Sequence, residues 1–138
     1  MIKKAIILSL SGQSLTKNEK KLFTKKTIPW GIILFKRNIK NFYQLKKLIS
    51  SLQRITKDKN YPILIDEEGG TVTRLQSIFL NKLYSQRFFG KLYESNPVLC
   101  INIYKLYIIS ICKLFKKLGI NINTSPVMDR LYPQTHFF

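Results

Sequence analysis

The chain has 138 residues, of which 45% are hydrophobic, and a formal net charge of +17. This length allows one domain at most, and the apolar content is sufficient for a substantial core. So positive a charge is typical of nucleic-acid or anionic-membrane surfaces, but here the lysines are dispersed, arginine is scarce and no known nucleic-acid-binding motif occurs. We therefore interpret the charge as a general compositional bias and expect no nucleic-acid partner.

Cysteine and histidine give no sign of a disulfide or a metal site. Cys100 and Cys112 are the only cysteines, and on one helix they would lie roughly 18 Å apart, too far for a bridge. No metal-ligand spacing is present, so we expect no metal and no cofactor. The chain begins like a signal peptide, but its apolar run over residues 5–10 is short and no convincing cleavage site follows. These features predict a protein of the reducing cytoplasm.

The first third of the chain reads as strand, helix and strand. Ala5–Leu10 is apolar and predicts a first buried strand. Thr16 and Glu19 have the spacing of a capping box, which predicts a short helix. We expect Ile28–Pro29 to end that helix, because proline disfavours a helical residue before it. Gly31–Phe35 predicts a second apolar strand.

A clear amphipathic helix follows, and then a third strand. The helix is predicted from Asn41 onwards, because apolar residues recur at three- and four-residue spacing: Phe42, Leu45, Leu48, Ile49, Leu52 and Ile55. After a turn at residues 58–61, Pro62–Ile65 contains an apolar run of the kind that is buried on both faces of a sheet.

Three consecutive carboxylates follow the third strand. Asp66, Glu67 and Glu68 are three of only seven acidic residues in the chain, and Gly69 and Gly70 come directly after them. Glycine allows a sharp backbone turn that other residues resist. In α/β folds, chemistry is delivered from the carboxyl ends of the strands. The pattern therefore indicates a functional site, with a solvated acidic turn as the alternative.

The second half of the chain is dominated by one long helix. Gln76–Asn96 is irregular and aromatic, with room for a short helix. Pro97 suits the first turn of a helix that runs to Leu118 and is apolar nearly all round. A transmembrane span and a buried helix both fit this composition. Because Lys105 interrupts the apolar run and Lys113 closes it, we favour the buried helix and expect no membrane span.

The order of these elements predicts an α/β fold with parallel strands. Ile120–Asn123 is the fourth short strand, so that strands and helices alternate along the chain. An open doubly wound sheet and part of a (β/α)₈ barrel both satisfy this pattern. The first strand lacks the Gly-x-Gly-x-x-Gly turn of dinucleotide-binding folds.

Four segments resemble glycoside hydrolase family 3, in family order and at family spacing. Gly31–Ile39 is similar to the Gly-x-Ile-Leu-Phe-x-Arg-Asn strand and turn. Ile65–Arg74 resembles the Asp-Gln-Glu-Gly-Gly-x-Val-x-Arg signature, and Gly119–Asn123 with Ser125–Asp129 resembles Gly-Ile-Asn followed by Ala-Pro-Val-x-Asp. Residues 132–136 fit the loop that follows. The resemblance implies that residues 1–138 are an incomplete family 3 N-terminal domain, the N-terminal half of a (β/α)₈ TIM-type barrel with about four parallel strands.

The same resemblance implies roles for individual residues. Asp66 matches the carboxylate that accepts hydrogen bonds from hydroxyls of N-acetylglucosamine, and Arg74 matches the arginine that helps to fix that sugar. Glu68 and Asp129 match carboxylates that support the site; for Asp129 a turn carboxylate is the alternative. Glu67 stands where the family often has Gln, which suggests a tolerant position.

The implied activity is that of a cytoplasmic β-N-acetylhexosaminidase, which removes N-acetylglucosamine from cell-wall muropeptides during peptidoglycan recycling. The family's acid/base segment Lys-His-Phe-Pro-Gly-His-Gly and its nucleophilic Asp do not occur in these residues, and His136 matches a non-catalytic loop position. We therefore assign no catalytic residue. The chain is either a glycosidase domain present only as its N-terminal half, through truncation, gene decay or division between chains so that another chain supplies the missing half, or a non-catalytic sugar- or partner-binding remnant with a basic surface.

Overall fold

A computed structural model of the chain describes residues 2–126, which form one parallel sheet with flanking helices. The sheet has the order β1-β2-β3-β4, and each neighbouring pair is parallel. The strands are β1 (Ile2–Ser9), β2 (Thr27–Leu34), β3 (Ile63–Ile65) and β4 (Ile122–Asn123). The predicted α/β class and parallel pairing are confirmed.

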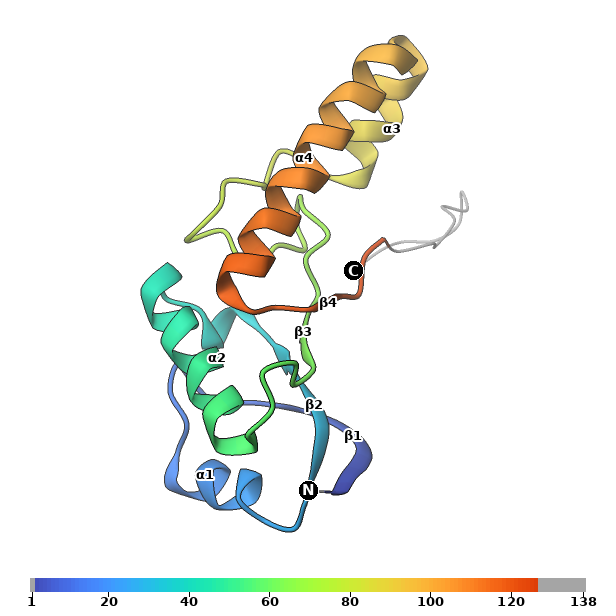
Figure 1. Cartoon of the computed structure of the whole chain (residues 1–138). Coiled ribbons are helices and arrows are strands. Elements are labelled where there is room, and N and C mark those ends of the chain that lie inside the picture. Colours follow the sequence, from blue (N-terminus) through green and yellow to red (C-terminus); the bar gives the residue numbers. More distant parts are fainter. Residues whose placement is uncertain (1, 127–138) are drawn as a thin grey trace, which may run out of the picture.

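Figure 1 shows α1 and α2 together on one side of the sheet, while the pair α3 and α4 extends beyond it. The helices are α1 (Lys17–Phe23), the short 3₁₀ helix η1 (Lys36–Asn38), α2 (Phe42–Thr56), α3 (Gln86–Ser95) and α4 (Pro97–Leu118). Thr16 and Glu19 form the predicted capping box of α1. The predicted end of that helix is wrong. It stops at Phe23, and Ile28–Pro29 lies inside β2, because the chain turns directly from α1 into the strand.

The core lies between the sheet and the inner faces of α1, α2 and the last turns of α4. Its buried side chains come from every layer and include Phe23, Ile28, Ile32, Leu34, Leu45, Ile49, Leu52, Ile63, Ile65, Phe115 and Leu118. All three residues of β3 are buried, as predicted, because neighbouring strands flank it on both sides. At Gly31 the strands approach so closely that a Cβ atom would lie 2.7 Å from the Cβ of Pro62.

The prediction that the first strand is buried is wrong. β1 is an edge strand, and nearly all of its residues are exposed, including Ile2, Ile6 and Ile7. An edge strand has a partner on one side only, and within residues 2–126 no layer covers its faces. Its apolar composition therefore predicted a strand correctly but not its burial.

The predicted bounds of α4 are confirmed, whereas its predicted burial is wrong. Only the residues that face the rest of the chain are buried, namely Cys100, Ile111, Phe115 and Leu118. By length and composition alone α4 could cross a membrane, and 17% of its most apolar stretch is buried. Exposed apolar side chains such as Val98, Leu106 and Ile109 lie on the side away from the buried face, interspersed with the polar residues Asn102, Lys105 and Lys113.

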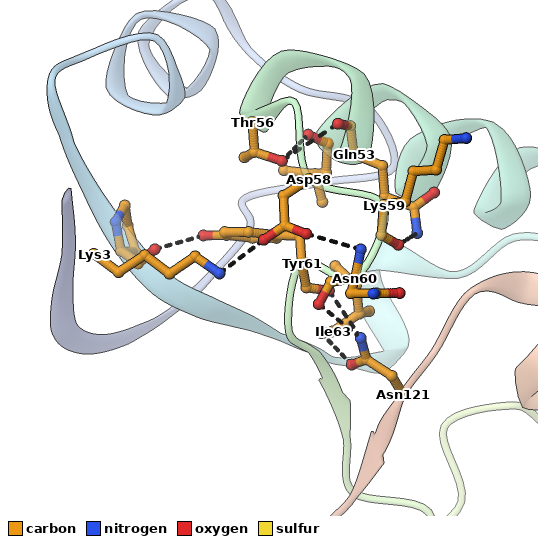
Figure 2. A network of polar contacts seen from close by, with 11 residues as sticks. Lys3, Gln53, Thr56, Asp58, Lys59, Asn60, Tyr61, Ile63 and Asn121 are labelled. Carbon is orange, nitrogen blue, oxygen red and sulfur yellow. Dashed lines mark hydrogen bonds and ion pairs between the residues drawn. The ribbon is translucent and has the colours of Figure 1, made fainter. Parts of the chain in front are cut away.

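A polar network ties the amino ends of β2, β3 and β4 together (Figure 2). The fully buried Tyr61 donates a hydrogen bond from Oη to the Pro29 carbonyl at 2.8 Å. Burial, assisted by the negative charge of Asp58, raises the pKa of Tyr61 to about 12. A hydrogen bond from Lys3 at 2.7 Å lowers the pKa of Asp58. Asn121 accepts from the Ile63 N–H at 2.8 Å and so pins the start of β3.

Candidate functional site

Asp66 and Arg74 form an ion pair at the carboxyl end of the sheet. Asp66 directly follows β3, and its Oδ2 accepts a hydrogen bond from Arg74 Nη2 at 2.9 Å. The Thr124 hydroxyl, just after β4, donates to Asp66 Oδ1 at 3.3 Å. Both charged side chains are 26% exposed, so they remain accessible to a ligand. The structure therefore brings together the two residues predicted to bind substrate, at the predicted edge of the sheet.

The ring of Phe35, the residue after β2, lies beneath the Arg74 guanidinium. The Arg74 Cζ atom is 5.8 Å from the ring centroid, and Arg37 Cζ approaches the same ring at 4.8 Å. The buried Asn38 side chain holds this turn by accepting from the Phe35 N–H at 2.9 Å and donating to the Leu10 carbonyl at 3.0 Å. Phe35 and Asn38, to which the sequence assigns no role, therefore support Arg74 from the end of the neighbouring strand β2.

Glu67 is a buried carboxylate and points away from the ion pair into the loop that follows. The residue is only 2% exposed. Oε2 accepts from the backbone N–H groups of Arg74 and Leu75, each at 2.8 Å. Oε1 accepts from the Asn81 side-chain amide, whose own oxygen accepts from the Thr73 hydroxyl at 2.5 Å. Sequence reasoning treated Glu67 as tolerant and did not find this role; the only signal was its place between two predicted site residues.

The predicted Gly-Gly turn is confirmed and lets this loop fold back on itself. Gly69 and Gly70 have φ values of 80° and 65°, which favour glycine. A Cβ on Gly69 would collide with the Tyr84 carbonyl, and one on Gly70 would lie 2.6 Å from the Cβ of Ser85. Both glycines are therefore required by backbone conformation and by close approach to the segment before α3.

Glu68 lies beside a small cavity of about 80 Å³, which Glu67 also lines. Aromatic rings of Tyr84, Phe89 and Tyr107 line it together with Glu68. Burial raises the pKa of Tyr107, although a hydrogen bond with Asn81 opposes the shift. This volume holds only a few water molecules, so the cavity is too small for a sugar ring. The supporting role predicted for Glu68 stays a prediction, and Asp129 lies outside the described residues.

No cluster of three or more potential metal ligands occurs within residues 2–126. What the site offers is a partly exposed carboxylate with acceptor capacity beside a partly exposed guanidinium. A carboxylate accepts from two hydroxyls at once, and a guanidinium donates with a rigid geometry. Together they suit a neutral, hydroxyl-rich ligand. In fold and site the chain is a parallel α/β sheet with an ion pair at the carboxyl ends of its strands, the edge at which (β/α)₈ barrels place their sites.

Comparison with known proteins points to one group of relatives, the bacterial beta-hexosaminidases. The chain is 31% identical over 124 residues to the beta-hexosaminidase of Pasteurella multocida, covering 90% of this chain and 34% of that protein. It is 28% identical over 126 residues to the beta-hexosaminidase of Nitrosomonas eutropha, covering 90% and 35%. The chain thus spans about a third of the length of these curated relatives. No protein-family model matches it.

Solved structures of similar fold come from the same kind of enzyme. A glycoside hydrolase family 3 β-N-acetylglucosaminidase from a Paenibacillus species aligns at 29% identity with a TM-score of 0.61, over 87% of this chain and 22% of that one. NagZ from Neisseria gonorrhoeae, in complex with N-trifluoroacetyl-D-glucosamine, aligns at 24% identity with a TM-score of 0.80, over 94% and 38%. These matches support a likeness between this chain and part of the N-terminal domain of glycoside hydrolase family 3 enzymes.

Proposed function

We propose that this chain forms the N-acetylglucosamine-binding part of a β-N-acetylhexosaminidase, with Asp66 and Arg74 as the sugar-contacting residues. The Asp66–Arg74 pair at the carboxyl end of β3 is the observation that carries the proposal. The relatives named beta-hexosaminidase, and a neighbour of the same fold bound to an N-acylated glucosamine, support the ligand class. The natural substrate is a cytoplasmic muropeptide released during peptidoglycan recycling, as the resemblance to the family implies.

Binding is tested by titrating the ¹⁵N-labelled chain with N-acetylglucosamine and following amide shifts. Asp66→Asn and Arg74→Gln each remove a charged hydrogen-bonding partner, which contributes about 1.5–3 kcal/mol. We therefore expect each variant to bind roughly 10- to 100-fold more weakly. Lys20→Ala and Lys47→Ala, on exposed positions of α1 and α2, serve as matched controls and should change nothing. Equal losses from the lysine variants would instead indicate a partner attracted by charge.

We further propose that the 138-residue chain binds this sugar without hydrolysing glycosides. A retaining glycosidase needs two carboxyl groups about 5–5.5 Å apart, or an equivalent acid/base beside a nucleophile. In the described chain Asp66 is paired with Arg74, and Glu67 is held by three donors within the loop. The purified chain should show no turnover of a chromogenic N-acetyl-β-glucosaminide. Turnover well above background would contradict this, and a loss of kcat without a change in KM in Asp66→Asn would make Asp66 a reacting group.

The exposed apolar residues of α4 and the two sheet edges fit a polypeptide that supplies the remaining strands and helices of the barrel. Leu106 on α4 is 66% exposed and Ile2 on β1 is 60% exposed. In a complete barrel, neighbouring strands and helices flank each element and cover part of such a surface. Adding the C-terminal two-thirds of the Pasteurella multocida beta-hexosaminidase to this chain should restore turnover. Association with anionic vesicles in place of that fragment would support a membrane surface as the partner instead.

A further inference from the structure

We propose that Glu67 is the positioning residue of the sugar site. Its buried carboxylate holds the main chain at Arg74 and Leu75, and thereby brings the guanidinium to Asp66. This inference rests on the proposed function for its consequence, the sugar affinity, but not for its geometry.

Glu67 closes the loop between the two members of the ion pair. Asp66 and Arg74 are eight residues apart, and the chain between them turns through two glycines in the left-handed region. The Glu67 Oε2 atom spans the opening of that loop by accepting both the Arg74 and the Leu75 N–H groups. Without this acceptor, two backbone donors at the point where Arg74 is presented lose their partner.

The neighbouring strand β4 fixes the backbone of Glu67. Asn123 in β4 accepts from the Glu67 N–H at 3.0 Å and donates to the Glu67 carbonyl at 3.1 Å. The same residue thus has its backbone locked to the sheet and its side chain locked to the loop. Glu67 therefore fixes the position of Arg74 relative to the sheet, in addition to the direct bond between Arg74 and Asp66.

Only some side chains at position 67 can accept from the two backbone N–H groups and also bond to Asn81. The bonds run in one direction, from the Thr73 hydroxyl to the Asn81 oxygen and from the Asn81 amide to Glu67 Oε1. A glutamine could keep its amide oxygen on the Arg74 and Leu75 N–H groups. Its NH₂ group would then donate to Asn81, provided that the Asn81 amide turns over and donates to Thr73. Leucine supplies no acceptor, and aspartate is one methylene too short to reach.

The experiment compares Glu67→Gln, Glu67→Leu and Glu67→Asp in the 138-residue chain. Each variant is examined for its urea unfolding midpoint, its affinity for N-acetylglucosamine, and the NMR signal of the Arg74 Nε–H, assigned by its loss in Arg74→Lys. That nitrogen is buried and lacks a hydrogen-bond partner, so its proton reports the guanidinium environment directly. Tyr61→Phe is the control, because it removes a buried hydrogen bond at the opposite end of β3.

We expect Glu67→Leu and Glu67→Asp to shift or broaden the Arg74 Nε–H signal and to weaken sugar binding at least tenfold. Glu67→Gln should keep the signal and bind within threefold of the parent. Tyr61→Phe should lower the urea midpoint without changing either property. If Glu67→Leu does not fold, Glu67→Asp decides. An unchanged signal in these two variants, or the same change in Tyr61→Phe, would overturn the inference; absence of sugar binding by the parent, with the signal moving as expected, would overturn only the proposed function.

Discussion

Replacing Tyr61 by phenylalanine tests how much the network at the amino ends of the strands stabilises the fold. The hydroxyl is fully buried and donates to the Pro29 carbonyl at 2.8 Å. Its removal deletes that buried hydrogen bond, which costs about 0.5–1.5 kcal/mol. With a urea dependence of about 1–3 kcal/mol per molar for a small domain, the unfolding midpoint should fall by roughly 0.5 M at pH 8.

The same substitution has a pH dependence of defined sign. Folding raises the pKa of Tyr61 to about 12 from its usual 10.0. The stability that this neutral hydroxyl contributes is therefore complete below pH 10 and is lost as the pH rises through 12. At pH 11 about 1.4 kcal/mol of it is gone. Lysine titration affects both proteins alike, so the stability difference between parent and Tyr61→Phe should shrink from pH 9 to pH 11. A constant difference over this range, measured by urea unfolding, would refute the reasoning.

Two further substitutions test local features of the fold. Gly31→Ala should destabilise by roughly 1–3 kcal/mol, because its Cβ would lie 2.7 Å from that of Pro62. The matched Gly90→Ala in α3, where no atom lies within 4 Å, should stabilise by about 0.5–1 kcal/mol; equal effects in urea unfolding would contradict the packing argument. Thr16→Ala should cost about 1 kcal/mol through loss of the capping box. Burial alone would raise the pKa of Glu19, but hydrogen bonds from Thr16 and from the loop before it lower that pKa. The stability difference between the parent and Thr16→Ala should therefore be present above pH 5 and diminish towards pH 3. Circular dichroism melts measure this difference.

Local signals in the sequence predicted most of the secondary structure. The capping pair at Thr16 and Glu19, the apolar spacing after Asn41, and Pro97 with Gly119 at the ends of α4 all act within a few residues. Such signals are readable without knowledge of the tertiary structure. Strand bounds were less accurate, because pairing rather than composition decides where a strand ends. β4 is only the two residues Ile122–Asn123, where four had been predicted.

Burial could not be predicted in the same way. An apolar run such as β1 has the same composition whether neighbours cover it on two sides or one, and position within the sheet decides which applies. The long helix α4 presents the same difficulty, since its exposed apolar residues need neighbouring elements to bury them. Both errors concern surfaces that no element within residues 2–126 covers.

The three consecutive carboxylates show why site residues need the structure. Asp66 pairs with Arg74 at the carboxyl end of β3, Glu67 turns inward to accept from backbone N–H groups, and Glu68 borders the aromatic cavity. Composition gives no means of separating these roles. A position that accepts Gln in related sequences looks tolerant, yet the geometry explains that tolerance without making the position unimportant. One oxygen atom serves both backbone donors, and either Glu or Gln carries it. Replacement by a residue that keeps this oxygen should therefore be mild, whereas any other replacement should disturb Arg74, and through it the proposed sugar site.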